Sequence, residues 1–316
     1  MPKTLTYLIN FIYILGYKAR TIIAKRYDPI VSRSFGNFKL KLFLSHHFVF
    51  MYKVFPLFER NLELLSLLVK KKYKTLYAID IGANVGDTLI YMNSENSADT
   101  HIMCVEGLDF YYSLLLENAK QFNNITCVKA LIGNENKSET FSVKRGQGSS
   151  LLEKSDTNNS VVQFKTLETI LEENPVFKQS RLIKIDTDGF DTLIIRSSEN
   201  VLRKYKPVIF FEFDNRLLEK HDGQYKQIFD LLSGIGYSDF AVFNYVGEYL
   251  FRFTADTFVH FLPLIFRLDI NFPRVKYYDI VACSKEDIDI MDELINKWEA
   301  TPPKKFTNLE LINFIR

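Results

Sequence analysis

Apolar residues along this chain gather in short runs, and the runs are separated by stretches in which apolar residues recur at helical spacing. Seven of the runs are typical of buried strands, and they cover residues 75–81, 101–106, 125–132, 181–186, 207–213, 237–244 and 277–283. Strands that alternate with helices form a mainly parallel sheet with helices on both faces. We therefore predict an α/β fold with a doubly wound, mainly parallel, seven-stranded sheet. Ligands of such sheets bind at the carboxyl ends of the strands.

A glycine turn follows the first predicted strand, and its composition indicates the charge of the ligand. The turn DIGANVG begins at Asp80, and its glycines allow positive φ and close approach of a ligand to the backbone. We expect the next helix to add free N–H groups at its N-terminus. A carboxylate directly before the glycines repels phosphate but suits the ammonium and sulfonium groups of S-adenosylmethionine. The predicted cofactor-binding residues of the turn are Asp80, Gly82, Ala83, Asn84 and Gly86.

A second acidic residue stands at the end of the next predicted strand. Glu106 lies 20 residues after Gly86, where a carboxylate can accept hydrogen bonds from both ribose hydroxyls of an adenosine. Glu106 alone does not separate S-adenosylmethionine from NAD, but Asp80 and the absence of a third glycine favour S-adenosylmethionine. We add Gly107 and Leu131, near the ends of the second and third strands, to the predicted cofactor site.

The charge of the chain is divided unevenly along its length. Residues 1–76 hold 14 Lys and Arg against 3 Asp and Glu, whereas residues 77–316 hold 26 against 35. We predict a basic, mainly helical N-terminal extension at residues 1–72 and a catalytic domain at residues 73–316. The extension begins with an apolar run at residues 4–17 that is too short to span a bilayer. An interfacial helix at an anionic membrane and a helix packed on the domain or on a second subunit both stay open.

Several motifs together resemble the FkbM-type family of class I S-adenosylmethionine-dependent methyltransferases. They are DIGANVGDT at 80–88, VEGLDFYYSLLLEN at 105–118, TLE at 166–168, KIDTDGFD at 184–191, PVIFFEFD at 207–214 and YYDIVACSKED at 277–287. The resemblance covers about residues 75–287. It implies a Rossmann-like fold, S-adenosylmethionine as cofactor, and O-methylation of a hydroxyl, often on a sugar or a natural product.

Methyl transfer to a hydroxyl requires alignment of the acceptor and removal of its proton. The carboxylates at the exits of the fourth and fifth strands border the reactive end of the cofactor in this topology. We therefore predict Asp186 first and Glu212 second as catalytic residues. We propose no metal site. Two other segments, a Gly/Ser loop at 146–150 and an aromatic stretch at 245–276, are predicted to close over a ligand and to form a substrate wall.

Alternatives remain for the acceptor and for the role of the extension. A sugar hydroxyl of a glycan, glycolipid or natural product is the favoured acceptor, and an RNA ribose reached through the basic extension is a less favoured one. A third reading is a non-catalytic protein that docks on membranes or forms a homodimer. Cys104, Cys127 and Cys283 lie in predicted strands without a C-x-x-C spacing, which favours a reducing compartment. We expect a cytoplasmic protein, with peripheral contact at the inner face of the membrane as an alternative.

Overall fold

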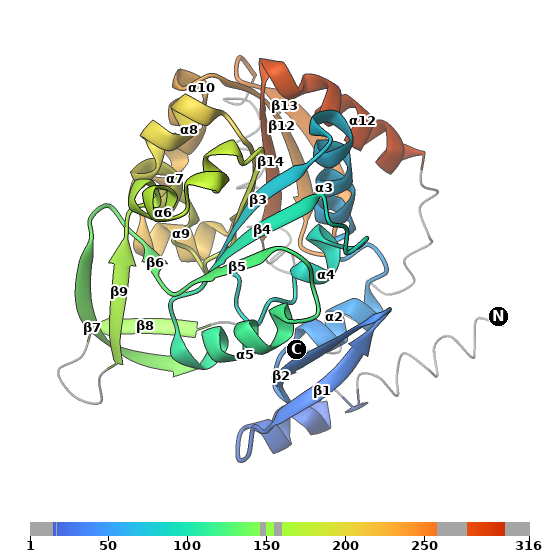
Figure 1. The fold of residues 1–316 in the computed structure, drawn as a ribbon, viewed down its shortest axis with the longest axis vertical. Helices are drawn as coiled ribbons and strands as arrows, with labels where there is room; N and C mark the ends of the chain where they lie inside the picture. The colour runs from blue at the N-terminus through green and yellow to red at the C-terminus, as the bar shows by residue number, and fades with distance from the viewer. Residues whose placement is uncertain (1–14, 17, 146–149, 155–159, 258–276, 301–316) are drawn as a thin grey trace.

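The computed structural model describes all residues except 1–14, 17, 146–149, 155–159, 258–276 and 301–316 (Figure 1). The apolar run 4–17, the Gly/Ser loop and the second half of the aromatic stretch 245–276 therefore lie largely outside the described residues.

A large twisted sheet forms the centre of the molecule, with strand order β13-β12-β14-β11-β10-β3-β4-β5. Its strands are β3 (Leu76–Ile81), β4 (Thr100–Val105), β5 (Ile125–Val128), β10 (Leu182–Ile185), β11 (Val208–Phe213), β12 (Tyr237–Asn244), β13 (Tyr249–Thr254) and β14 (Tyr278–Ser284). The five strands from β5 to β11 are parallel, and β14 is antiparallel to both β11 and β12. This arrangement confirms the predicted fold class, and β13 adds an eighth strand to the seven predicted ones.

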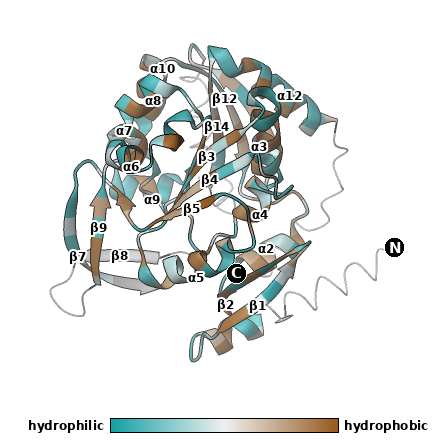
Figure 2. Ribbon diagram, viewed as in Figure 1, coloured by the Kyte–Doolittle hydropathy of each residue, from teal (hydrophilic) through white to brown (hydrophobic). Residues whose placement is uncertain are grey.

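Helices cover both faces of this sheet. The helices are α2 (Phe48–Val54), α3 (Arg60–Tyr73), α4 (Leu89–Met92), α5 (Asp109–Ala119), α6 (Leu167–Glu173), α7 (Asp191–Ser197), α8 (Glu199–Tyr205), α9 (Asn215–His221), α10 (Ile228–Gly234) and α12 (Ile288–Glu299). Short 3₁₀ turns occur at η1 (Pro175–Gln179), η2 (Tyr225–Gln227) and η3 (Lys285–Asp287). Figure 2 shows hydrophobic residues along central strands such as β3 and hydrophilic ones on the outer side of the helices.

The sheet separates two hydrophobic cores because side chains alternate between its faces. On one face, Ala78 belongs to a core formed with the N-terminal extension, α3, α5 and α12. On the other face, Ile79 and Ile81 belong to a core formed with α6 to α10. The strands are therefore apolar on both sides, which explains why their sequences are nearly continuous apolar runs.

The prediction of a single strand at residues 125–132 was wrong. The chain pairs with β4 only as far as Val128, which lies opposite Val105, the last residue of β4. Beyond that point no neighbouring strand is left to pair with. The chain leaves the central sheet, and Leu131–Ile132 becomes β6 of a separate sheet. That sheet has the order β6-β9-β7-β8, with β7 (Lys137–Arg145), β8 (Ser150–Lys154) and β9 (Ser160–Lys165).

The N-terminal extension contains a β-hairpin as well as helices. Strands β1 (Ile30–Phe35) and β2 (Phe38–Phe43) pair around Gly36, which has a φ of +57°. In β2 the buried Leu40 and Leu42 alternate with the exposed Lys39 and Lys41, a period of two that the prediction of a mainly helical extension overlooked. No helix in the described part of the chain is long and apolar enough to cross a membrane.

Candidate functional site

The glycine turn after β3 is held against the ends of β4 and β10. The backbone N–H groups of Gly82 and Ala83 both donate to the carbonyl of Val105, at 3.0 and 3.1 Å. Gly82 has a φ of +81°, and a Cβ there would lie 1.9 Å from the carbonyl oxygen of Asp186. Only glycine fits at this position, so the turn passes directly over the end of β10.

The helix after this turn does not offer the N-terminal binding site that the sequence predicted. Helix α4 begins at Leu89, three residues after Gly86, and contains only four residues. The N–H of Asn84 is already used, because it donates to Oε2 of Glu106 at 3.0 Å. The predicted cofactor residues therefore lie in the turn itself and at the end of β4, without a helix N-terminus beside them.

Glu106 is fixed at the end of β4 by two backbone donors. Its Oε2 accepts from Asn84, and its Oε1 accepts from the N–H of Leu108 at 2.7 Å. The residue is 6% exposed, and burial raises its pKa to about 7 against the opposing effect of these backbone hydrogen bonds. Each carboxylate oxygen keeps a lone pair for another donor, as contact with two ribose hydroxyls requires.

A cavity of about 170 Å³ opens beside Glu106. Five of the predicted cofactor residues line it: Gly82, Asn84, Glu106, Gly107 and Leu131. The wall also contains aromatic side chains that the sequence analysis had not assigned: Tyr111, Phe141, Phe164, Phe190 and His221. The cavity is thus largely apolar, with the carboxylates of Glu106, Asp186 and Asp188 in its wall, and it suits a flat adenine ring joined to a ribose.

Gly107 brings the backbone close to Leu131 at this cavity. A Cβ on Gly107 would lie 2.5 Å from Cγ of Leu131 and 3.1 Å from its backbone nitrogen. The two residues therefore fit together only because Gly107 has no side chain. Ala83 and Gly86 belong to the same turn but do not line the cavity, and Ala83 is buried at 1% exposure.

Asp80 is buried rather than open to the cavity. It is 0% exposed, and its carboxylate accepts a hydrogen bond from the hydroxyl of Thr88. Nζ of Lys184 lies 3.3 Å from Oδ1 of Asp80 and 3.2 Å from Oδ2 of Asp186. The direct contact between Asp80 and the cofactor stays a prediction, and the immediate partner of Asp80 in this structure is Lys184.

Lys184 forms the link between Asp80 and the predicted catalytic Asp186. Burial alone would lower the pKa of Lys184, but the charges of Asp186 and Asp80 outweigh it and raise the pKa well above its usual value. Lys184 is therefore a cation inside the protein, at 1% exposure. The sequence analysis assigned it no role, because a lysine within an apolar strand does not reveal its partner.

A second cavity, of about 330 Å³, adjoins the first one, and we call it the acidic chamber. The two cavities share Gly82, Asn84, Asp186 and Asp188 in their walls. The carboxylates that line the acidic chamber are Glu59, Asp87, Asp186, Asp188, Glu212 and Asp214. Its basic residues are Lys184 and Arg216, and Arg216 is paired with Asp214 at 2.8 Å.

Glu212 and Glu59 both line this chamber, and each is buried among other carboxylates. Burial, followed by the charge of Asp186, raises the pKa of Glu212 well above its usual value. The pKa of Glu59 is also raised, by burial and then by the charge of Asp279. The Oε2 atom of Glu59 is buried and has no hydrogen-bond partner among the described residues. Both carboxyl groups thus bind a proton more strongly than an exposed glutamate does.

The N-terminal extension contributes one wall of the acidic chamber through His46, Phe48, Met51, Phe58 and Glu59. Nε2 of His46 lies 3.4 Å from Oδ1 of Asn84, and Nδ1 of His46 accepts from the N–H of Phe48 at 3.4 Å. Burial lowers the pKa of His46 to about 4, so this ring is neutral and holds Asn84 of the glycine turn. Sequence reasoning missed this role because the two residues are 38 positions apart.

Among the described residues, no group of three or more His, Cys, Asp or Glu side chains has an arrangement that could hold a metal ion.

Comparison with models of known protein families identifies a family that matches this sequence. The model of the FkbM methyltransferase domain matches residues 80–238. No curated protein matches the chain. Among solved structures, the chain is similar to a methyltransferase FkbM from Methylobacillus flagellatus KT, with 14% identity, 52% of this chain and 39% of that chain covered, and a TM-score of 0.37. The aligned part thus spans less than half of that protein.

Two other solved structures cover more of the chain. The TYW2 protein of M. jannaschii in complex with AdoMet has 10% identity, covers 80% of this chain and 84% of its own, and has a TM-score of 0.37. A putative O-methyltransferase from Klebsiella pneumoniae has 11% identity, covers 74% of this chain and 89% of its own, and has a TM-score of 0.39.

Proposed function

The chain belongs to the FkbM methyltransferase family and uses S-adenosylmethionine as its methyl donor, and from this premise we propose that it methylates a sugar hydroxyl. The acceptor is a glycan, a glycolipid or a glycosylated natural product. The observation that carries the proposal is the position of Asp186. Its carboxylate stands where the apolar cavity beside Glu106 meets the acidic chamber.

In this proposal the apolar cavity beside Glu106 binds the cofactor, and the acidic chamber binds the acceptor. The apolar cavity has the carboxylate that a ribose requires and the close backbone approach at Gly82 and Gly107. S-adenosylmethionine supplies there a methyl group already activated by a sulfonium. The acidic chamber is polar and has acceptors for hydroxyl hydrogen atoms, as a sugar requires.

Asp186 and Glu212 have different roles in this proposal. Nζ of Lys184 lies 3.2 Å from Oδ2 of Asp186 and orients this carboxylate, so Asp186 accepts a hydrogen bond from the acceptor hydroxyl and aligns it with the methyl group. Glu212 lies in the chamber behind it, and its raised pKa suits a group that takes up the proton released by the hydroxyl.

The charge of the chamber supports a sugar rather than RNA as acceptor. The lining has six carboxylates and two basic side chains, both of which are paired with Asp residues. A phosphodiester backbone would enter this chamber against like charge. A neutral or cationic sugar meets no such repulsion.

The test combines cofactor binding with methyl transfer to a panel of sugars. Isothermal titration is expected to show binding of S-adenosylhomocysteine by the wild type and by Asp186→Asn and Glu212→Gln. Transfer of labelled methyl from S-adenosylmethionine should fall on the order of 10²-fold or more in both variants, the usual scale for a general base. Glu172→Gln, an exposed acid on α6, is the matched control and should keep full activity.

Two results would contradict the proposal. One is methylation of a nitrogen or carbon atom of the acceptor, identified by mass spectrometry of the product. The other is full activity of both Asp186→Asn and Glu212→Gln, which would move the proton acceptor elsewhere.

A further inference from the structure

Exposed hydrophobic side chains are concentrated in one short segment of the N-terminal extension. The described part of the chain has nine large hydrophobic residues that are exposed, and five of them lie within residues 15–30. We call these five the N-terminal apolar patch: Leu15 at 50%, Ile22 at 69%, Ile23 at 54%, Tyr27 at 71% and Ile30 at 54% exposure. Single exposed apolar residues are ordinary, but a group of this kind marks an interaction surface.

Local geometry keeps the patch together. Residues 18–24 are helical and carry Ile22 and Ile23, and Leu15 lies in the turn of helix at residues 15–16. The N–H of Tyr27 donates to the carbonyl of Ile23 at 2.9 Å, so Tyr27 follows Ile23 by one turn.

The segment that holds the patch is strongly basic. Lys18, Lys25 and Arg26 are exposed between the apolar residues, and the hairpin adds Arg33 and Lys39. Asp28 is the sole acidic residue in the sequence from 1 to 58. Its carboxylate accepts hydrogen bonds from the N–H and the hydroxyl of Ser45, both at 2.8 Å. The surface around the patch is therefore cationic, with no exposed carboxylate of its own.

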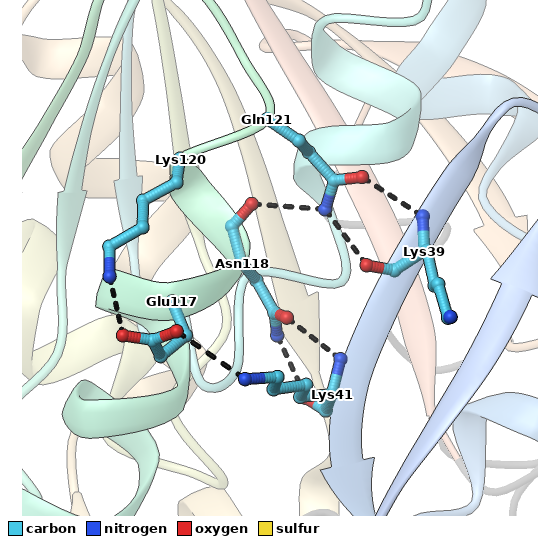
Figure 3. Close-up of polar contacts among 6 residues, drawn as sticks. All are labelled: Lys39, Lys41, Glu117, Asn118, Lys120 and Gln121. Carbon is cyan, nitrogen blue, oxygen red and sulfur yellow. Dashed lines mark hydrogen bonds and ion pairs between the residues drawn. The ribbon is translucent and has the colours of Figure 1, made fainter.

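The hairpin that follows the patch is fastened to the methyltransferase fold (Figure 3). Gln121 accepts from the backbone N–H of Lys39 at 2.9 Å and donates to its carbonyl at 3.0 Å. Asn118 makes the same pair of bonds with Lys41, at 2.7 and 2.8 Å. Nδ2 of Asn118 also donates to the carbonyl of Val85 in the glycine turn at 2.7 Å. A contact made by the extension is thus connected to the cofactor site.

We propose that the N-terminal apolar patch docks on a bilayer that contains anionic lipids. Isoleucine side chains and a tyrosine enter the interface between headgroups and acyl chains, while the surrounding lysines and arginines contact the lipid phosphates. This inference goes beyond the proposed methyl transfer and does not depend on it.

Two other partners fit the surface less well. RNA would pair with the basic residues but leave four aliphatic side chains of the patch in water, because bases stack on aromatic rings and Tyr27 is the one aromatic member. A second copy of the chain would bring two surfaces of the same positive charge together. An anionic bilayer satisfies both the charge and the apolar area.

The experiment measures co-sedimentation of the full chain with vesicles. One set of vesicles consists of phosphatidylcholine, and the other also contains phosphatidylglycerol. The wild type is expected to bind the anionic vesicles, and its binding should weaken as salt is added, because salt screens the surface charge.

Two variants and two matched controls separate charge from apolar contact. Lys25→Gln/Arg26→Gln should weaken binding about 25-fold, at roughly fivefold for each basic residue near the surface. Ile22→Ser/Ile23→Ser should weaken it by about tenfold or more through lost apolar burial. The controls are Lys178→Gln/Arg203→Gln and Val161→Ser/Val176→Ser, which change exposed basic residues and exposed β-branched apolar residues elsewhere. We expect both to bind as the wild type does, and thermal unfolding verifies that all four variants fold.

Three outcomes would overturn the inference. The first is the absence of binding to anionic vesicles at low salt. The second is equal loss of binding in the variants and in their controls. The third is a different occupant: a dimer in analytical ultracentrifugation that Ile22→Ser/Ile23→Ser dissociates, or RNA binding by a chain that ignores vesicles.

Discussion

Replacing Lys184 by methionine removes the cation between two carboxylates while keeping the length and most of the volume of the side chain. Asp80 then stays inside the protein at 0% exposure, with only the hydroxyl of Thr88 as a partner. At the 3.3 Å between Nζ and Oδ1, the attraction lost is about 5 kcal/mol for an effective dielectric constant of 20. Removing one partner of a buried pair typically costs about 3–5 kcal/mol, because the other charge remains desolvated.

The assay is a double-mutant cycle with Asp80→Asn, measured by chemical and thermal unfolding. Lys184→Met alone should lower the free energy of unfolding by about 3–5 kcal/mol and the melting temperature by roughly 10 °C. Lys184→Met/Asp80→Asn should recover most of that loss, because the unpaired charge at position 80 is gone and the carboxylate of Asp186, 41% exposed, is partly solvated. Methyl transfer should not recover, since Asp186 still lacks its counter-ion.

Additivity would refute the reasoning. If the double variant is destabilised by the sum of the two single changes, Asp80 and Lys184 do not interact in the folded protein. If the double variant regains both stability and methyl transfer, Lys184 supports the fold but does not orient Asp186. Binding of S-adenosylhomocysteine, measured in the same variants, separates loss of the cofactor site from loss of the catalytic step.

Three more predictions concern the cofactor site and its walls. Burial raises the pKa of Glu106 to about 7, and only the ionised carboxylate accepts hydrogen bonds from both ribose hydroxyls. The affinity for S-adenosylhomocysteine should therefore rise by up to about tenfold per pH unit below pH 7 and level off above it. Titration calorimetry of Glu106→Gln should show an affinity that does not change with pH. Gly107→Ala should push Leu131 into the cavity and weaken cofactor binding on the order of tenfold, whereas Gly223→Ala, with no atom within 4 Å of its new Cβ, should not. His46 has a pKa of about 4 in the folded protein and a reference value of 6.5, so the unfolded chain binds more protons between these two pH values. The stability that the neutral ring contributes is therefore complete above pH 6.5, and on the order of 3 kcal/mol of it is lost as the pH falls to 4. A comparison of acid unfolding between the wild type and His46→Gln should reveal this loss.

The strands and the cofactor turn could be predicted because their signals are local. A strand buried on both faces must be apolar throughout, so β3, β10 and β11 are visible as runs in the sequence. Gly82 and Glu106 stand at the ends of such runs, where the topology of a parallel sheet places its ligand. Five of the eight predicted cofactor residues accordingly line one cavity.

The acidic chamber could not be predicted in this way. It brings Glu59 and His46 of the extension against Lys184 and Glu212, which lie more than a hundred residues later in the chain. Each of these residues has an ordinary local explanation, and apart from Lys184, which pairs with Asp186 two positions later, none forms an ion pair at helical or strand spacing among the described residues. The hairpin was missed although β2 alternates locally. The amides that bind its backbone are distant in sequence: Asn118 lies in α5 and Gln121 just after it, 77 and 82 residues from their partners.

By itself, the order of residues determined the α/β fold, the turn at residues 80–86 and the acid at the end of the next strand, because backbone preferences and the burial of strands act over a few neighbouring positions. The folded molecule alone decided that Asp80 faces Lys184 instead of the cavity, and that the extension forms a wall of the acidic chamber. Those contacts arise when whole layers pack together. Packing chooses among many partners of similar chemistry, and the choice depends on which side chains the sheet and its helices bring within a few ångströms of one another.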